Sequence, residues 1–144
     1  MLDRGLGSCV LRDPRAARCV IDNWKWFDGI RYTLIAWVVM PNHVHVLIEV
    51  FGTTSLGSIV QSWKSYTGRV IGQLLAGDDI AAPRNRGGVW MREYWDRLIR
   101  DDAHLAAAIN YIHSNPVRAK LVGTAHDWPW SSASTWVGGD GRGK

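Results

Sequence analysis

Apolar and polar residues alternate along residues 43–50, directly after the turn-forming sequence Met40-Pro41-Asn42. Proline presets the first backbone dihedral of a turn, and asparagine tolerates the second. The period of two predicts a β-strand with one buried face, because successive side chains of a strand point to opposite sides. The buried face comprises Val44, Val46, Ile48 and Val50. The opposite face carries His43, His45, Leu47 and Glu49.

The apolar segment 32–39 before this turn predicts a second, buried strand, so the two segments form a hairpin. Two segments with helical apolar spacing flank the hairpin. The first starts after Asp13, a capping residue that proline follows, and ends at Asp28-Gly29. The second starts after Ser55, and its apolar positions are Leu56, Ile59, Val60, Trp63, Val70, Ile71 and Leu74.

A third helix is predicted to start at Asp101 or Asp102, either of which can cap it. Its predicted end is Pro116, because a proline disfavours helical dihedrals at the residue before it. Tyr111 and Asn115 lie four residues apart, so they share one flank of this helix. A phenol and an amide would then face whatever the helix packs against. The apolar stripe beside them consists of Leu105, Ile109 and Ile112.

A further strand is predicted within residues 89–99, which completes the order helix, strand, strand, helix, strand, helix. This order is typical of α+β proteins with an antiparallel sheet, close to the ferredoxin-like pattern with helices packed on the sheet. A chain of 144 residues is large enough for an ordinary core, and we expect a single domain over residues 1–144.

Composition narrows the function classes only slightly. The chain has 17 basic and 13 acidic residues, a net charge of +4 that permits nucleic-acid binding. Nine tryptophans can serve in the core or as stacking platforms for unpaired bases. Cys9 and Cys19 do not suggest a disulfide framework, which favours a reducing compartment. No apolar run has membrane-spanning length and no signal-peptide segment is recognisable, so we expect a cytoplasmic protein.

The two histidines are the first candidate for chemistry. Neutral imidazoles at His43 and His45, side by side on one strand face, can hold one divalent metal ion. The competing interpretation is that both are polar residues beside a turn, bonded to backbone. Glu49 shares their face but lies six residues from His43, so a charge pair at the rim of the sheet is favoured over metal ligation.

Four sequence blocks occur in one order: M-P-N-H-V-H, then V-W-M-R-E-Y-W-D-R-L-I-R, then Y-I-H-S-N-P-V-R-A-K-L-V, then W-P-W-S-S-A. Together they resemble the REP-associated tyrosine transposases, single-tyrosine members of the HUH nuclease superfamily, in which two histidines flank one hydrophobic residue. The resemblance covers about residues 5–136, and the shared order of the blocks is more specific than any one of them.

The resemblance implies a ferredoxin-like core that begins with a strand before the first helix. No convincing counterpart of that strand is found in this sequence. Either Val10-Leu11 is its remnant, or the chain starts inside a longer sequence of the family type. The missing strand would sit centrally in the sheet, so this departure bears on folding and activity more than on ancestry.

The resemblance also implies a chemistry. The Tyr111 oxygen would attack a backbone phosphate of single-stranded DNA, leaving a 5′-phosphotyrosine link and a free 3′-OH that can later rejoin the strand. His43, His45 and Asn115 would hold Mg²⁺ or Mn²⁺, with some preference for Mn²⁺ because of the imidazoles. The DNA partner would be a hairpin formed by repeated extragenic palindromes. The protein, a monomer or a homodimer, would be associated with the nucleoid when bound to DNA.

Alternatives accompany each role. Tyr66 and Tyr94 are rival nucleophiles, and Tyr111 could simply cover a helix flank with its hydroxyl in water. Asn115 precedes proline and could cap a following helical turn. At the level of function, the chain could be a hairpin-binding module without catalysis, or a phosphodiesterase in which water attacks in place of Tyr111.

DNA contacts are assigned more loosely, since any basic or aromatic side chain among them could be an ordinary surface or core residue. The candidate phosphate contacts are Lys64, Arg69, Arg84, Arg86, Arg92, Arg97, Arg118 and Lys120. The candidate stacking residues are Trp90, Trp95, Trp128 and Trp130.

Overall fold

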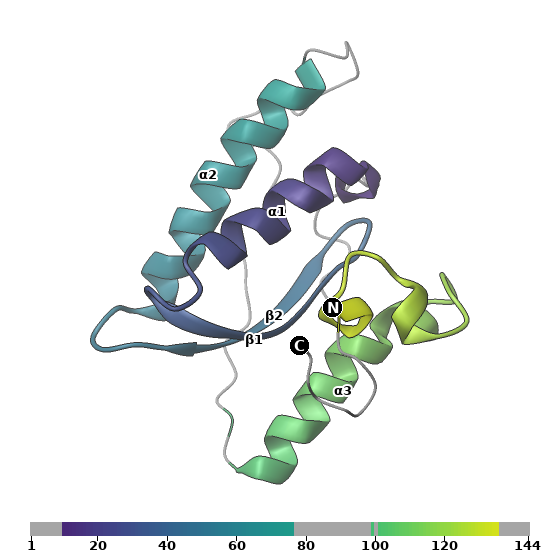
Figure 1. Ribbon diagram of the computed structural model, residues 1–144. Coiled ribbons are helices and arrows are strands. Elements are labelled where there is room, and N and C mark those ends of the chain that lie inside the picture. Colours follow the sequence, from purple (N-terminus) through teal and green to yellow (C-terminus); the bar gives the residue numbers. More distant parts are fainter. Residues whose placement is uncertain (1–9, 77–98, 100, 136–144) are drawn as a thin grey trace.

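The computed structural model describes residues 10–76, 99 and 101–135. Three helices and a two-stranded antiparallel sheet make up this part of the chain, and the sheet lies between α1 and α2 on one face and α3 on the other (Figure 1). The elements are α1 (Pro14–Trp26), β1 (Tyr32–Val39), β2 (Val44–Val50), α2 (Leu56–Ala76) and α3 (Asp102–Arg118). The predicted α+β class with helices packed on an antiparallel sheet is therefore confirmed. The strand expected within residues 89–99 falls almost wholly outside the described residues.

The hairpin has the predicted strands and turn. Tyr32 pairs with Val50 at one end and Val39 with Val44 at the other, and a β-bulge interrupts the register between Leu34 and Ala36. On β2 the predicted alternation holds: the valine and isoleucine row packs toward α1 and α2, whereas Leu47 packs toward α3. Neither face is open to solvent as a whole, which explains why most of β2 is half-buried.

The bulge changes which residues of β1 face which layer. Leu34 belongs to the core under α1 and α2, but both Ile35 and Ala36 belong to the cluster under α3. Trp37 then returns to the first layer. An extra residue in one strand shifts the side-chain parity by one position. The bulge thus lets Ala36 and Val38 form a flat apolar floor for α3.

All three predicted helix starts carry side-chain caps. The carboxylates of Asp13 and Asp101 accept hydrogen bonds from the N–H groups of Arg15 (2.9 Å) and His104 (2.8 Å). The Ser55 hydroxyl accepts from the N–H of Ser58 at 3.1 Å. These oxygens satisfy backbone donors that have no partner inside the helix. Asp101, rather than Asp102, is the cap of α3.

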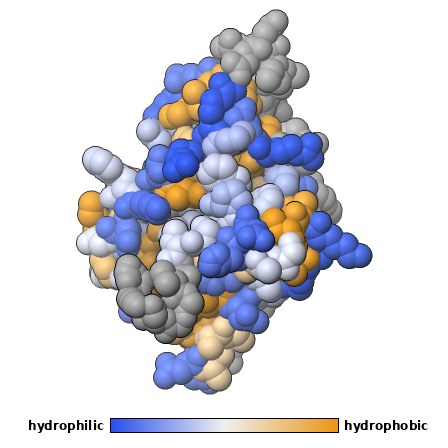
Figure 2. All heavy atoms as spheres, turned by 45° about the vertical axis from the view of Figure 1, so that its right-hand side comes forward, coloured by the Kyte–Doolittle hydropathy of each residue, from blue (hydrophilic) through white to orange (hydrophobic). Residues whose placement is uncertain are grey.

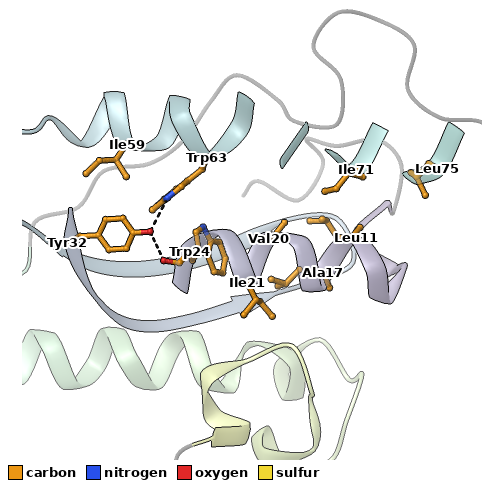
Figure 3. Close-up of a cluster of buried hydrophobic side chains, with 12 residues drawn as sticks. Leu11, Ala17, Val20, Ile21, Trp24, Tyr32, Ile59, Trp63, Ile71 and Leu75 are labelled. Carbon is orange, nitrogen blue, oxygen red and sulfur yellow. Dashed lines mark hydrogen bonds between the residues drawn. The ribbon is translucent and has the colours of Figure 1, made fainter. Parts of the chain in front are cut away.

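The larger core lies between the sheet, α1 and α2 (Figure 3). The Tyr32 hydroxyl is its polar centre: it donates to the Trp24 carbonyl oxygen at 2.7 Å and accepts from the Trp63 indole N–H at 3.1 Å. Residues spaced four apart form the buried stripe of α2. These residues are Ile59, Trp63, Thr67, Ile71 and Leu75. The apolar spacing predicted Val70 and Leu74 in this stripe, but Thr67 and Leu75 are buried there instead. Val70 and Leu74 are only half-buried.

The expected end of the third helix is wrong, and so is one of the two alternatives for the N-terminal segment. Helix α3 does not stop at Pro116 but includes it and ends at Arg118. A proline inside a helix lacks one backbone donor, and the helix instead closes after it, where Lys120 adopts a positive φ of 61°. The N–H groups of Lys120 and Leu121 bond back to Val117 and Pro116, a Schellman arrangement.

The second correction concerns the N-terminal segment. Val10–Arg12 form one turn of 3-10 helix, so Val10-Leu11 are not a remnant of a strand. The Leu11 side chain is buried in the larger core, and its N–H donates to the Pro41 carbonyl oxygen at 3.1 Å. This segment therefore braces the hairpin turn from outside the sheet.

The surface offers no extended apolar belt on the face drawn in Figure 2, where hydrophilic side chains surround smaller hydrophobic patches. Among the described residues, Trp26 and Ile30 are the most exposed large apolar side chains, at 71% and 65%. Within the described ranges, none of the helices combines the length and the apolar character needed to cross a membrane.

We expect Tyr32→Phe to lower the free energy of unfolding by about 1–3 kcal/mol, because it leaves two buried polar groups without a partner. Burial raises the pKa of Tyr32 to about 12, whereas a phenol in the unfolded chain titrates near ~10. The stability that comes from the neutral phenol is thus complete below pH ~10 and is lost as the pH rises toward ~12.

Urea unfolding followed by circular dichroism across this alkaline range measures both effects. The wild type should lose stability more steeply than Tyr32→Phe, which lacks the titrating group. Equal slopes for the two proteins would contradict the assignment of the raised pKa to this buried phenol.

Candidate functional site

The hairpin turn positions the two histidines. His43 closes the turn, where its carbonyl oxygen accepts the N–H of Met40 at 2.8 Å, and His45 lies opposite Val38 in the register. The two imidazole rings are nearly perpendicular, with centroids 5.1 Å apart. The predicted side-by-side projection of His43 and His45 is therefore what the strand produces.

The turn also orients the His43 ring. Its Nδ1 lies 2.9 Å from the side-chain oxygen of Asn42. An amide oxygen only accepts hydrogen bonds, so this contact selects the tautomer with its proton on Nδ1 and the lone pair on Nε2. The asparagine of the turn thus has a second role beyond its backbone conformation, which the sequence reasoning did not assign.

Tyr111 meets this pair from the opposite layer. Its ring packs edge-on against His45, with centroids 5.6 Å apart and an interplanar angle of 83°. The side chain remains 49% exposed, so the phenol is accessible to a large ligand while it touches the imidazole. The structure therefore brings together three of the four residues assigned to the chemistry.

Arg118 also packs on the ring of Tyr111. Its guanidinium carbon lies 4.2 Å from the centroid of the Tyr111 ring, a cation–π distance. The same guanidinium donates to the Ser114 hydroxyl at 2.7 Å and to the Tyr111 carbonyl oxygen at 3.3 Å. The Arg118 side chain therefore runs back along α3 and places a fixed positive charge beside the phenol.

Asn115 lies one turn further along α3 and differs from Tyr111 in exposure. It is only 8% exposed, and its carbonyl oxygen accepts the N–H of Ala119 at 3.0 Å. Because it lies inside the helix, the alternative that it caps a following helical turn is wrong. Its side chain shares the flank of Tyr111, as its spacing predicts, and its role as a metal ligand stays a prediction.

His113 is a residue that the sequence reasoning left without a role. Its Nε2 lies 2.7 Å from the Ser132 hydroxyl oxygen, and burial lowers the pKa of its imidazole. The Y-I-H block contained this histidine, but the partner lies 19 residues further on. Only the three-dimensional path of the chain after α3 brings the two together.

The candidate DNA contacts are placed unevenly. Arg118 belongs to the site, and Lys120 is an exposed residue just after α3. Lys64 and Arg69 are on α2, which covers the opposite face of the sheet, and Arg69 stacks on Tyr66 at 5.6 Å (Figure 1). The remaining basic and tyrosine candidates fall outside the described residues, together with two tryptophans. These residues are Arg84, Arg86, Arg92, Arg97, Tyr94, Trp90 and Trp95.

The other two tryptophans pack against the protein. Trp128 is half-buried against the cluster under α3 and donates its indole N–H to the Val39 carbonyl oxygen at 3.0 Å. Trp130 packs on the larger core, and the Arg18 guanidinium lies 5.4 Å from its ring centroid. Both tryptophans therefore help to hold residues 128–134, called the C-terminal segment below, on β1.

The site thus consists of a histidine pair at the start of β2 and a tyrosine on α3 that packs against it. A family model described as "Transposase IS200 like" matches residues 19–115, well over half of the chain. The chain belongs to this IS200-like transposase family. The matched range includes His43, His45, Tyr111 and Asn115.

Two curated relatives refine this placement. The chain is 28% identical over 103 residues to a putative REP-associated tyrosine transposase of Haemophilus influenzae, covering 70% of this chain and 58% of the relative. It is 24% identical over 102 residues to a REP-associated tyrosine transposase of Escherichia coli K12, covering 70% and 54%. The chain thus spans just over half the length of these relatives, and the predicted relationship to the REP-associated tyrosine transposases is confirmed.

A solved structure supports the fold. The REP-associated tyrosine transposase bound to a REP hairpin has a TM-score of 0.63 to this chain at 23% identity. The likeness covers 87% of this chain and 68% of that one. The helices and the β-hairpin of this chain therefore share the fold of the matching part of that protein.

We expect Arg118 and Tyr111 to stabilise each other. A double-mutant cycle with Arg118→Ala and Tyr111→Ala should give a coupling energy of about 0.5–1 kcal/mol in urea unfolding, the value for an exposed cation–π pair. Arg69 and Tyr66 on α2 form a matched control at a longer distance and should couple more weakly. Additive effects of the two α3 substitutions would contradict the contact.

Proposed function

We propose that this chain cuts single-stranded DNA beside a hairpin and rejoins it through a covalent 5′-phosphotyrosine at Tyr111. The observation that carries the proposal is the contact between the Tyr111 ring and His45, which in turn packs on His43. Membership of the IS200-like transposase family supports it. The hairpin substrate is proposed because a relative of the same fold is bound to a REP hairpin.

The proposed reaction is a transesterification. The Tyr111 oxygen forms a bond to the phosphorus of the scissile phosphodiester, and the bond from phosphorus to the 3′ oxygen breaks. The phenol loses its proton, and the departing oxygen takes one up as a 3′-OH. In the reverse step a 3′-OH attacks the phosphotyrosine and releases Tyr111, so the number of phosphodiester bonds is conserved.

Arg118 has a defined part in this proposal. Its guanidinium lies beside the nucleophile and carries a permanent charge. A phosphate that approaches Tyr111 therefore meets a positive charge that is already fixed in place, without a large rearrangement of a flexible side chain. We infer that Arg118 helps to bind the scissile phosphate and to offset the negative charge that builds up on it.

His43, His45 and Asn115 are proposed to hold Mg²⁺ or Mn²⁺, which would polarise the phosphate when bound. The two imidazole rings lie 5.1 Å apart, centroid to centroid, on the same face of the sheet. They are close enough that both could bind one ion. The proposed third ligand is the side-chain amide of Asn115, which shares the α3 flank of Tyr111.

We expect purified protein to form a covalent adduct with a hairpin oligonucleotide that carries single-stranded flanks and a 3′ fluorescent label. The adduct is expected in Mn²⁺ and should survive a denaturing gel, because its link to the protein is covalent. It should be fluorescent, because the 3′ label stays on the fragment that is joined to the tyrosine. Tyr111→Phe should give no adduct, since the attacking oxygen is gone. Tyr66→Phe, on the opposite face of the sheet, is the matched control and should retain it, as should Tyr94→Phe.

Other outcomes separate the alternatives. Adduct formation that survives Tyr111→Phe but not Tyr94→Phe would refute the assignment of the nucleophile. Cleavage without any adduct, unchanged in Tyr111→Phe, would indicate that water attacks. Hairpin binding of equal strength with and without metal, and no cleavage, would indicate a binding module.

We expect the protein to bind Mn²⁺ and His45→Ala to abolish this binding, as measured by isothermal titration calorimetry. Asn42→Ala should weaken it about tenfold, because residues that orient a ligand ring commonly contribute 10–100-fold to affinity. Asn110→Ala, at an exposed position of α3, is the control and should bind normally. An affinity that His45→Ala leaves unchanged would overturn the metal site.

A further inference from the structure

The outer edge of β1 is held by the C-terminal segment. The Ser132 hydroxyl accepts the Trp37 N–H at 2.9 Å and lies 3.3 Å from the Trp37 carbonyl oxygen. Val39 donates its N–H to the Trp130 carbonyl oxygen at 2.8 Å, and Val38 forms a bridge with Ser131. Side-chain and backbone groups of this segment thus pair with β1 as a neighbouring strand would.

The same hydroxyl reaches α3. The Ser132 oxygen lies 2.7 Å from His113 Nε2, a shorter contact than either of its contacts with Trp37, and the serine is fully buried. A hydroxyl has one donor and two acceptor positions, so Ser132 can accept from the Trp37 N–H while it bonds to the imidazole. One buried side chain therefore joins the edge of the sheet, the C-terminal segment and α3.

His113 and Tyr111 lie on different sides of the helix. Residues two apart are separated by about 200° around an α-helix. Ile112 lies between them and is buried on the floor formed by Ala36, Val38 and Met40. The isoleucine keeps this side of the helix against the sheet, but an apolar contact is not directional and tolerates small rotations about the helix axis.

Rotation of α3 would move the phenol directly. A side-chain tip lies about 5–6 Å from the helix axis, so a roll of about 10° displaces it by about 1 Å. A misplacement of that size at a reacting atom can lower a rate by about 10²-fold. The hydrogen bond at His113 is directional and lies on the flank away from Tyr111, which makes it suited to oppose this roll.

We propose that the His113–Ser132 hydrogen bond sets the rotation of α3 and so holds the Tyr111 phenol against His45. The inference rests on the proposed function of Tyr111. His113 is then a positioning residue, and Ser132 fixes it to the immobile edge of β1. Through this bond, segment 128–134 would act on the site from a distance, by way of α3.

The test compares His113→Ala, Ser132→Ala and the double variant with the wild type in single-turnover adduct formation. Each single variant should form adduct about 10²-fold more slowly while hairpin affinity hardly changes. The double variant should be no slower than either single one, because both remove the same bond. His113→Gln, which retains a polar group at similar reach, should recover most of the rate, and the exposed His126→Ala is the control.

A second measurement does not depend on activity. The chain has four tyrosines, and in protein labelled with 3-fluorotyrosine the ¹⁹F signal of Tyr111 is identified by its absence in Tyr111→Phe. This signal should shift in His113→Ala and Ser132→Ala but not in His126→Ala, while that of the buried Tyr32 stays unchanged. If the wild type forms no adduct, the proposed function fails, and this spectrum still tests the positioning.

Three results would overturn the inference. The first is a wild-type rate in both single variants, and the second is an unchanged Tyr111 signal in both. The third is a general loss of structure, seen as a shift of the Tyr32 signal as well, in Ser132→Ala and His113→Gln alike. That result would mean that the contact maintains the fold as a whole and does not specifically orient α3.

Discussion

The antiparallel pairing of β1 and β2 across the Pro41-Asn42 turn is the constraint on which the rest of the structure depends. A two-stranded sheet is marginal in water without further packing, so both of its faces must be covered. The side-chain alternation of β2 sends its valines and isoleucine toward α1 and α2 and leaves His45 and Leu47 on the other face. Whatever covers the second face must then lie against the histidines, and α3 does so with Tyr111 on its flank.

Much of this arrangement could be predicted because its signals are local. Asp13, Ser55 and Asp101 each cap the helix that follows, and the period of two in residues 43–50 specified both faces of β2. The bulge at Leu34–Ala36 has no such local signal. It depends on how the sheet packs against helices that are distant in the sequence. Helix α3 continues through Pro116 because hydrogen bonds from the N–H groups of Lys120 and Leu121 close it later. The proline by itself does not predict these bonds.

Some features of the candidate site could likewise be predicted from the sequence, and others could not. The histidine pair and the flank shared by Tyr111 and Asn115 follow from strand and helix periods. Their meeting in space does not, because more than sixty residues separate them and the relation depends on how α3 lies on the sheet. Asn42 and Arg118 were visible in the sequence as a turn residue and a basic residue. Their contacts with His43 and Tyr111 need coordinates, since a side chain's partner depends on its rotamer.

The family model matches the chain up to Asn115, and two contacts of α3 involve residues beyond that point. Arg118 stacks on the Tyr111 ring, and Ser132 ties the far flank of α3 to β1. His43, His45 and Tyr111 therefore lie within the range that the family model matches, whereas Arg118 and Ser132 lie beyond it. Under the proposed positioning role, a substitution in the tryptophan- and serine-rich segment 128–134 would slow adduct formation without changing His43, His45 or Tyr111. Within the part of the chain that the structure describes, the outer edge of β1 has backbone groups that need partners. The segment that provides these partners also bonds to α3, the helix that carries Tyr111.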